Sequence, residues 1–494
     1  MHSNRHGLKY YAPVMLKGSI AQTLSNAATQ LVSILLLPII TAYLNPKDFG
    51  IFSMVATVET FLSLLYNPGL LSATVRMYHD TYSERERKKL IGSALRFVIY
   101  FPLICSLIFL IVGPLLFPVI FKEFSFFPWG ILAIFLALFI QVNRLWSTLM
   151  SLQYKVYKIA IFSFISMLGG TLVTLVLVVG FKLGALGKVI GMFPPALILS
   201  GIGLPALLKY SEGNWSFENL KKQLKMGFPL IMGIWSYSIL YIGDRYMLER
   251  MVDITSVGIY SLGYKIAQLP MFFVNGVRQL WNPVFYENMN NGDYKTTTRL
   301  VEFYVAVLGF AHIFVIMFTK EIMHFFINKQ YKDAIPIIGV IVIGVFFSAL
   351  LTISNSMLGF EKKFGTTSII ATIAAISNIV LNLWLIPKWG IMGAAFTTAI
   401  SYFLYLTLGL YKVRDMFKII PVLKVLLFSA IAVVLSYLVT FGYIHQDVGW
   451  HEFIIKVLFI FIFISIVFLL RIIKLNDIRS ILQLFRKRFR REYV

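Results

Sequence analysis

The sequence has few of the residues that keep a protein in water or crosslink it. Charged residues make up only 14% of the 494 residues, hydrophobic residues make up 58%, and Cys105 is the single cysteine. One cysteine excludes an intramolecular disulfide. A composition with so few charged and so many hydrophobic residues also excludes an ordinary soluble domain. We therefore expect the bilayer to be the main solvent of this chain.

The sequence also lacks the motifs of several catalytic and cofactor chemistries. The segment from Gly184 to Lys188 has a superficial likeness to a phosphate-binding loop, but the four-residue spacing and the following Ser or Thr are missing. A single cysteine excludes a cysteine cluster for a metal ion. We therefore predict no catalytic residue, no metal and no cofactor, and we expect no ATP hydrolysis by this chain.

Long hydrophobic blocks, in contrast, are abundant. They run for about 20 residues or more, the length that a helix needs to cross roughly 30 Å of hydrocarbon. This pattern predicts an all-α polytopic membrane protein with about 14 transmembrane helices. The loops between them are at most about 20 residues long, which leaves no room for a soluble catalytic domain. The expected spans are 18–43, 49–75, 91–120, 124–147, 157–181, 184–208, 226–248, 256–282, 300–327, 334–358, 364–386, 390–411, 419–441 and 453–473.

The charge balance is strongly basic, with 45 Lys and Arg against 22 Asp and Glu. Most basic residues fall in the terminal segments and in alternate loops, so the positive-inside rule predicts that both termini are cytoplasmic. The run from Arg486 to Arg491 is expected to lie against anionic lipid headgroups. The basic excess therefore indicates membrane orientation and lipid partners rather than nucleic acid. Because no small-residue cleavage site follows the first apolar block, we expect the first span to be retained.

An internal repeat divides the predicted spans. The hexamer Phe49–Met54 recurs in type as Val257–Leu262, and a K-x-G-x-x-G motif that begins at Lys182 recurs at Lys388. Each copy holds six spans, an even number, so the copies share one membrane orientation and are related by an axis along the membrane normal. The repeat predicts two parallel six-helix bundles and a C-terminal segment with two accessory helices and a basic tail. The corresponding ranges are 1–208, 209–412 and 413–494.

Ionisable and amide side chains within the spans are the candidate site residues, because they are costly in a bilayer unless they face a cavity or a partner. Two like bundles with substrate between them have the organisation of an alternating-access transporter. Cations in such a cleft would attract phosphate oxygens, and Glu59 or Asp244 could bind a coupling ion or a proton. The predicted substrate-binding residues are Glu59, Asn67, Arg76, Asp244, Arg245, Lys265, Asn275 and Arg278.

Several of these residues have a structural interpretation as well. Asp244 and Arg245 are adjacent, so they point about 100° apart on a helix, and ion pairs across helices would explain them equally well. Arg76 and Arg278 lie near helix ends and could extend to the membrane interface instead. Lys265 and Arg278 are thirteen residues apart. They share no face of a straight helix, although the proline between them can bend it.

Three motifs resemble a known family. The segment Asn45–Phe52 has the pattern N-P-x-D-F-G-I-F, Gly243–Leu248 reads GDRYML in the seventh span, and Val257–Leu262 opens the eighth. With the span number and the repeat, these motifs resemble the bacterial polysaccharide-transporter family. Its members are the Wzx-type lipid-linked oligosaccharide flippases of the multidrug/oligosaccharidyl-lipid/polysaccharide (MOP) superfamily. Asp244 and Arg245 match the family's charged position at the start of the second half.

The resemblance implies a function, a location and partners. It implies that the chain moves undecaprenyl-diphosphate-linked oligosaccharide repeat units to the outer leaflet of the bacterial cytoplasmic membrane, for surface polysaccharide biosynthesis. It further implies a transporter rather than an enzyme, with polysaccharide polymerase machinery as a possible partner. The polyprenyl tail can stay in lipid, so only the diphosphate and sugars need a hydrated basic cleft.

Two other function classes remain open at this point. A cation-coupled drug or metabolite antiporter of the same superfamily would favour acidic and aromatic cavity residues. Bases outnumber acids among the candidates here. A membrane-embedded polysaccharide enzyme would normally present a large outer loop with catalytic His, Asp or Arg, and no predicted outer loop is long enough.

Overall fold

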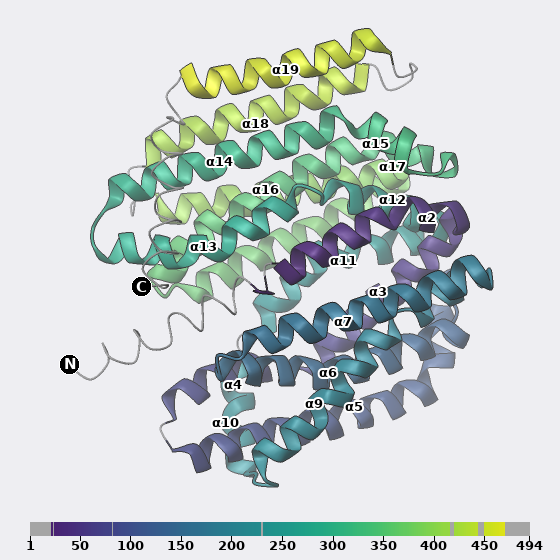
Figure 1. Cartoon of the computed structure of the whole chain (residues 1–494), viewed down its shortest axis with the longest axis vertical. Coiled ribbons are helices and arrows are strands. Elements are labelled where there is room, and N and C mark those ends of the chain that lie inside the picture. The colour runs from purple at the N-terminus through teal and green to yellow at the C-terminus, as the bar shows by residue number, and fades with distance from the viewer. Residues whose placement is uncertain are drawn as a thin grey trace. The chain divides into compact units, whose positions relative to one another are not determined.

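The computed structural model describes residues 21–22, 24–81, 83–228, 231–414, 419–442 and 449–469 (Figure 1). All regular secondary structure in these ranges is helical. The chain forms two compact units: unit 1 is Met1–Ser261 with Asn382–Ile391, and unit 2 is Leu262–Leu381 with Met392–Val494. Within the helices, the side chains of 272–273, 276–280, 282–283 and 419–423 lie outside the described part.

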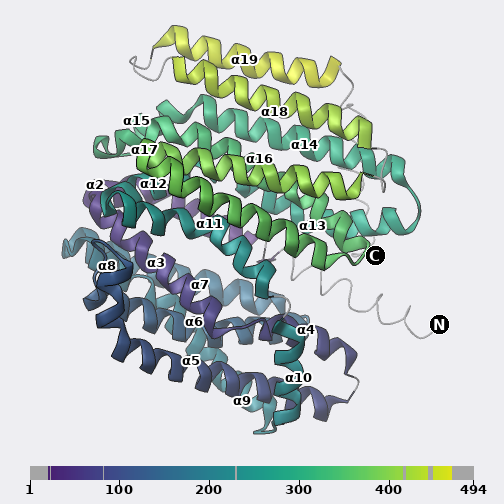
Figure 2. The ribbon, with the colours of Figure 1, turned by 180° about the vertical axis from the view of Figure 1, so that it is seen from behind.

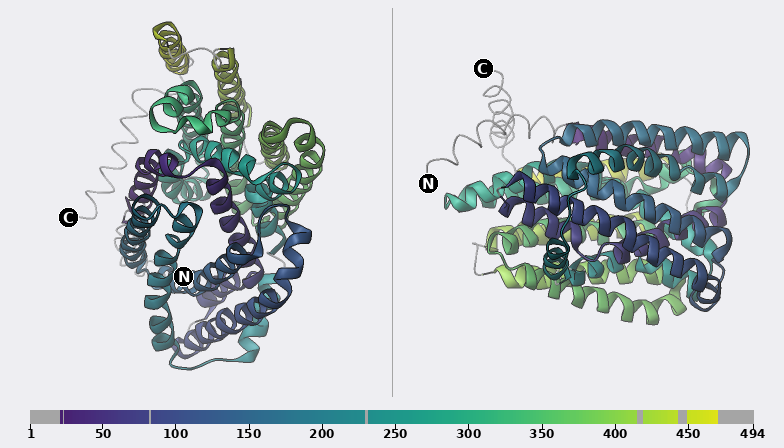
Figure 3. Two further views of the ribbon diagram at one scale, coloured as in Figure 1. Left: turned by 90° about the vertical axis from the view of Figure 1, so that its right-hand side faces the viewer. Right: turned by 90° about the horizontal axis from the view of Figure 1, so that it is seen from below.

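Unit 1 contains the helices of the first half of the chain. They are α2 (Leu37–Tyr43), α3 (Pro46–Tyr66), α4 (Leu70–Asp80), α5 (Glu84–Ile120), α6 (Ile131–Leu152), α7 (Val156–Leu175), α8 (Gly184–Ile190), α9 (Phe193–Ser211), α10 (Phe217–Gly227) and α11 (Ile231–Met251), with short helical turns at Phe126–Gly130 and Val176–Gly180. α6 packs against α9, α3 and α5, and α7 packs against α9 (Figure 2). The long helices of this unit run side by side along roughly one direction (Figure 3).

Unit 2 contains most of the second half. Its helices are the end of α12 (Ile254–Ala267), whose first part up to Ser261 belongs to unit 1, then α13 (Met271–Asn290), α14 (Tyr294–Met317), α15 (Thr319–Phe326), α16 (Ile335–Phe360), α17 (Phe364–Val413) except its Asn382–Ile391 stretch, α18 (Ile419–Gly442) and α19 (Trp450–Leu469), with a short turn at Lys329–Ala334. α14 packs against α18, α16, α13 and α19, as Figure 1 shows for α14, α18 and α19. The two C-terminal helices α18 and α19 are therefore integral parts of this unit.

The prediction of an all-α polytopic membrane protein is confirmed. In the described ranges, 11 helices are long and apolar enough to cross a membrane, or up to 12 if the bent pair α10 and α11 is one span. This count is below fourteen for identifiable reasons. α17 alone covers the predicted spans 364–386 and 390–411, which join at Gly390 with a non-helical φ of 53°. The predicted span 256–282 is divided between α12 and α13.

The predicted span 49–75 is wrong at its C-terminal end. α3 ends at Tyr66, and a new helix, α4, starts at Leu70. Pro68 disfavours a helical conformation at the residue before it, and Gly69 adopts a left-handed φ of 73° that favours glycine. Arg76, expected near the end of this span, therefore lies within the separate helix α4.

The region around Pro270 forms a complete break rather than a bend. α12 ends at Ala267 and α13 begins at Met271, directly after Pro270. Because a proline has no N–H to donate and clashes with the preceding turn, one continuous helix cannot pass this point without distortion. Lys265 and position 278 consequently lie on different helices. They therefore do not have the relative positions expected for one straight helix.

Side-chain caps determine where two of the long helices begin. The Asn45 side chain accepts a 2.8 Å hydrogen bond from the Asp48 N–H, and Pro46 occupies the first position of α3. Asp293 caps α14 in the same way through a 3.1 Å bond from the Thr296 N–H. Hydrogen bonding to Thr296 also holds the pKa of Asp293 below its ordinary value. The N-P-x-D pattern of the sequence is thus a helix start signal.

The two copies of the repeated hexamer contact each other directly. A Cβ atom added to Gly50 would lie 1.9 Å from the carbonyl oxygen of Ile254, and one added to Gly258 would lie 1.8 Å from that of Pro46. Only a hydrogen atom fits at either position. α3 and the beginning of α12 therefore cross with their backbones in contact, and the reciprocal pattern reflects the sequence repeat.

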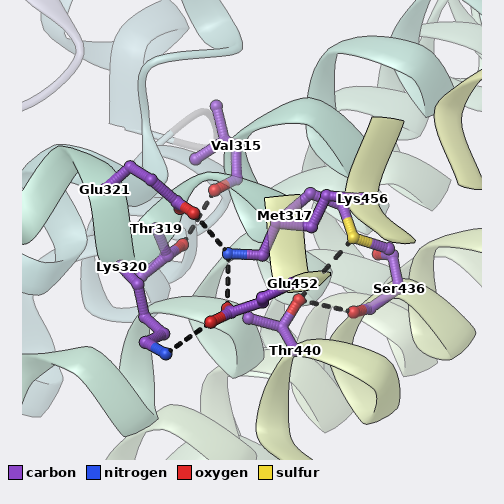
Figure 4. Close-up of polar contacts among 9 residues, drawn as sticks. All are labelled: Val315, Met317, Thr319, Lys320, Glu321, Ser436, Thr440, Glu452 and Lys456. Atoms are coloured by element: carbon purple, nitrogen blue, oxygen red, sulfur yellow. Dashed lines mark hydrogen bonds and ion pairs between the residues drawn. The ribbon is translucent and has the colours of Figure 1, made fainter. Parts of the chain in front are cut away.

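Four ionisable groups, of which three are buried and Glu321 is partly buried, connect α15 to α19 in unit 2 (Figure 4). The Lys456 ammonium contacts Glu321 and Glu452, each at 2.6 Å, and the Lys320 ammonium contacts Glu452 at 2.8 Å. We call Lys320, Glu321, Glu452 and Lys456 the ion quartet. Two cations balance two carboxylates, so the group as a whole is neutral. A buried arrangement of this kind is stable only while every charge keeps its partner.

Lys456→Met is expected to lower the stability of the protein by about 3–5 kcal/mol, because the buried Glu452 and the partly buried Glu321 would lose the cation that they share. The apparent melting temperature of the detergent-purified protein measures this loss. Lys222→Met is the matched control, since Lys222 pairs with Glu218 at the exposed surface of α10. That change should cost at most about 1 kcal/mol. Equal melting temperatures for the two variants would show that the quartet contributes no stability.

Candidate functional site

The first candidate cluster is centred on Asp244 in α11. Asp244 is completely buried. One of its carboxylate oxygens accepts a 2.7 Å bond from the Tyr260 hydroxyl of α12, and the other accepts a 2.7 Å bond from the Asn382 amide of α17. Both partners are completely buried as well. Asp244 thus connects three helices of unit 1, in a position where an ionised carboxylate depends on these donors.

Arg245 belongs to the same cluster although it points to a different side of α11. Its guanidinium lies 5.9 Å from the ring centres of both Tyr241 and Tyr260, and it donates a 2.8 Å bond to the Tyr241 carbonyl oxygen. Arg245 is only half-buried. Tyr260 therefore joins the two charged residues, because its hydroxyl donates to Asp244 while its ring faces Arg245. Asp244 and Arg245 thus have different surroundings, and the partners of Asp244 on other helices are a tyrosine hydroxyl and an asparagine amide.

Glu59 is the centre of a second cluster, between α3 and α6. The Ser63 hydroxyl donates a 2.7 Å bond to the Glu59 carboxylate, and the Gln141 amide donates a 3.0 Å bond to the Ser63 oxygen. Glu59 and Gln141 are both buried. Arg144, one helical turn beyond Gln141 on α6, interacts electrostatically with Glu59. This cluster combines a carboxylate, a hydroxyl, an amide and a nearby guanidinium.

The other predicted site residues have varied surroundings. Asn67 lies at the end of α3 rather than inside a span, and its side chain accepts a 3.3 Å bond from the Leu71 N–H, which bridges the break before α4. Arg76 is exposed on α4. Lys265 on α12 and Asn275 on α13 are half-buried in unit 2. The side chain of Arg278 lies outside the described part of the structure.

Glu249 is a buried carboxylate that sequence reasoning missed. It lies near the end of α11 and accepts backbone hydrogen bonds of 2.6–3.1 Å from Lys122, Glu123 and Phe124. These three residues follow α5, so Glu249 fixes the α5–α6 connection to α11. Its role in the structure is that of a cap for unpaired N–H groups.

Two partners of Asp244 could have been found from the sequence. Tyr260 is the position of the repeated hexamer at which the first copy has Phe52, so only the second copy carries a hydroxyl there. Asn378 and Asn382 are polar residues four apart in an otherwise apolar run. Amides inside a span usually have a function or a partner. No local pattern in the sequence shows which carboxylate these side chains hydrogen-bond.

The chemistry available in these clusters is ionic and polar. Among the described residues, no group of three or more His, Cys, Asp and Glu side chains is placed to hold a metal ion. Asp244 and Glu59 offer carboxylates in apolar surroundings, and Arg245 offers a guanidinium that suits bidentate contact with phosphate oxygens. A polar or anionic ligand with a small coupling cation or proton fits these groups best.

Comparison with known proteins identifies related sequences. The family described as polysaccharide biosynthesis protein matches residues 15–289. An uncharacterised membrane protein of Methanocaldococcus jannaschii is 24% identical over 286 residues, which cover 56% of this chain and 55% of that protein. A putative O-antigen transporter of Shigella flexneri is 21% identical over 406 residues, which cover 79% of this chain and 95% of that protein.

A solved structure has the same fold. The lipid II flippase MurJ in an inward closed conformation superimposes with a TM-score of 0.70, over 91% of this chain and 98% of that one. The sequence identity is 20%, so the likeness establishes a shared fold and nothing more. The match with the archaeal protein extends over only about half of either chain, 56% and 55%.

Proposed function

The chain belongs to the polysaccharide biosynthesis protein family, and on this basis we propose that it flips undecaprenyl-diphosphate-linked oligosaccharide repeat units across the bacterial cytoplasmic membrane. It is a multi-pass membrane protein with the fold of a flippase. In this proposal both termini are cytoplasmic, the two repeats move against each other to open the site to each side in turn, and the product passes to polysaccharide polymerase machinery. The chain acts as a transporter and not as an enzyme.

The observation that carries this proposal is the match over 95% of the length of the putative O-antigen transporter. The matching region includes most of this chain, so it is not limited to one short motif. Apolar composition alone would not distinguish a flippase from another membrane protein. The family match to residues 15–289 adds independent support.

The Asp244 cluster is the proposed contact for the headgroup. The Arg245 guanidinium is partly accessible and would pair with diphosphate oxygens, while Asp244 holds Tyr260 and Asn382 in place. Arg76, Lys265 and Arg278 would add positive charge along the path, and Asn67 and Asn275 would add amides. The lipid tail remains in hydrocarbon, so the protein needs to compensate only the polar headgroup for lost water.

The lipid pool of a deletion strain tests this function. Without the protein, undecaprenyl-linked repeat units should accumulate on the cytoplasmic side and surface polysaccharide should disappear. Extraction and mass spectrometry of the lipid-linked oligosaccharides measure the pool. Restoring the gene should reverse both changes. An unchanged pool together with altered efflux of cationic dyes would contradict the flippase assignment and support an antiporter instead.

A further inference from the structure

Arg96 marks the point at which α5 changes from charged to apolar. The segment Glu84–Lys89 at the beginning of this helix consists entirely of charged residues, whereas no charged residue occurs from Phe97 to Ile120. At about 1.5 Å per residue this uncharged stretch is roughly 36 Å long, which is enough to cross about 30 Å of hydrocarbon. Arg96 therefore lies where the hydrocarbon of the bilayer meets the lipid headgroups.

The Arg96 guanidinium is stacked on an aromatic ring. The guanidinium carbon lies 4.3 Å from the centre of the Trp215 ring, and both side chains are exposed. A guanidinium that lies flat on a ring presents its N–H groups at its edge, where two of them can bond the oxygens of one phosphate. Tryptophan is also enriched at the interface between membrane and water. The stacked pair thus offers a phosphate contact at the depth of the headgroups.

Trp215 is held in this position by its two neighbours in the chain. The Ser93 hydroxyl of α5 donates to the Ser216 carbonyl oxygen and accepts from the Ser216 N–H, each at 2.9 Å. On the other side of Trp215, a Cβ added to Gly92 would lie 1.8 Å from the Asn214 carbonyl oxygen, so the two backbones are in contact. The loop before α10 is therefore fixed to α5, and the stacked pair does not need a ligand to form.

Arg96 forms no ion pair with any residue that the structure describes. On the exposed side of α10, Lys221 and Lys225 also lack a carboxylate partner within the described ranges, and like charges one turn apart repel each other. The acids of α5, of α10 and of the loop before α10 are each paired with another base. These pairs are Glu84 with Arg87, Glu86 with Lys89, Glu212 with Lys88 and Glu218 with Lys222.

We propose that Arg96 and Trp215 form a binding site for the phosphate of an anionic membrane phospholipid, whose acyl chains lie along α5. Beyond Arg96, the same face of the helix presents the exposed apolar side chains of Tyr100, Leu103 and Leu107. The phosphate and the acyl chains of one lipid thus meet a cation and an apolar face in the right order. In the orientation proposed above, this lipid belongs to the cytoplasmic leaflet. The site does not depend on the proposed transport function.

The surplus of positive charge selects an anionic lipid. A zwitterionic headgroup such as phosphocholine would bring its own cation next to Arg96 and the lysines of α10, and like charges at short distance repel each other. A phosphatidylglycerol headgroup brings the same phosphate without that cation. We therefore expect the site to prefer phosphatidylglycerol over phosphatidylcholine with identical acyl chains.

Photo-crosslinking tests the site at the place where the acyl chains should lie. The full chain in detergent receives phosphatidylglycerol with a photoactivatable diazirine in an acyl chain, and peptide mass spectrometry quantifies crosslinks to the segment Phe97–Leu107. Unlabelled phosphatidylglycerol should suppress these crosslinks at a concentration at least about tenfold lower than phosphatidylcholine does. Equal suppression by the two lipids, or no crosslink to this segment, would overturn the proposal.

Variants separate this site from general attraction to a basic protein. Arg96→Gln should reduce the crosslinks at least about fivefold, and Trp215→Leu should reduce them at least about threefold. Arg85→Gln is the matched control, because it removes the same charge from an exposed position on the same helix, and it should leave the crosslinks unchanged. An unchanged yield in Arg96→Gln, or an equal loss in Arg85→Gln, would contradict the site.

Two further measurements keep the result decisive. The melting temperature of each variant without added lipid shows whether it folds, and if Arg96→Gln does not, Arg96→Lys takes its place, since it keeps the charge but loses the two parallel bonds to phosphate. Its crosslinks should fall at least about twofold, and a wild-type yield would overturn the site. Undecaprenyl diphosphate serves as a second competitor. Suppression by this lipid at a lower concentration than by phosphatidylglycerol would assign the site to the transported lipid and overturn the proposal.

Discussion

Asp244→Asn is expected to reduce surface polysaccharide by at least about tenfold while the protein remains in the membrane. The substitution keeps the size of the side chain and removes its charge. Tyr260 and Asn382 both donate to Asp244, and an asparagine offers only one oxygen to these two donors. The new amide nitrogen therefore meets one of these two groups as a donor, so that bond must be reversed or lost, at a cost of up to about 1–3 kcal/mol. This cost is small enough for the helices to assemble.

Immunoblotting of membranes and quantification of surface polysaccharide together measure the effect. Arg245→Ala should give a similar loss, because it removes the proposed contact with diphosphate. Tyr260→Phe should have a weaker effect, since Asp244 keeps its charge and its bond from Asn382. Normal polysaccharide in both Asp244→Asn and Arg245→Ala would refute the assignment of this cluster to the substrate path.

The partners of Asp244 show which parts of a site can be predicted from sequence. Asp244 itself stands out because a carboxylate within an apolar span needs a reason to be there. Asn382 lies 138 residues further along the chain, and no local pattern states that the two meet. The same holds for Glu59, which was predicted as a site residue, and for Gln141, which was not, although Ser63 joins the two by hydrogen bonds.

The helix breaks illustrate the corresponding limit for the fold. Hydrophobicity locates the spans because the bilayer demands long apolar helices. It does not show where a helix ends when the apolar run continues, as it does through Pro68 and Gly69 into α4. The backbone preferences of those two residues decide the end of α3, and they are visible in the sequence once proline and glycine are considered before hydropathy.

Gly258→Ala is expected to produce the largest loss of stability, at least about 3 kcal/mol, because the added methyl would overlap a backbone atom that cannot turn away. Its Cβ would lie 1.8 Å from the Pro46 carbonyl oxygen and 2.9 Å from the Gly50 nitrogen. α3 and α12 would have to separate. Protein abundance in membranes and the melting temperature in detergent report this loss.

Gly201→Ala is the matched control for Gly258→Ala, since it lies in α9 and an added Cβ meets nothing within 4 Å. That variant should be as stable as the wild type or slightly more stable, because alanine favours a helix. Equal stability of the two variants would refute direct backbone contact at the crossing. Gly50→Ala should resemble Gly258→Ala. The double variant should lose less stability than the two single variants lose together. The first added methyl already separates the two helices, so the second methyl meets less overlap.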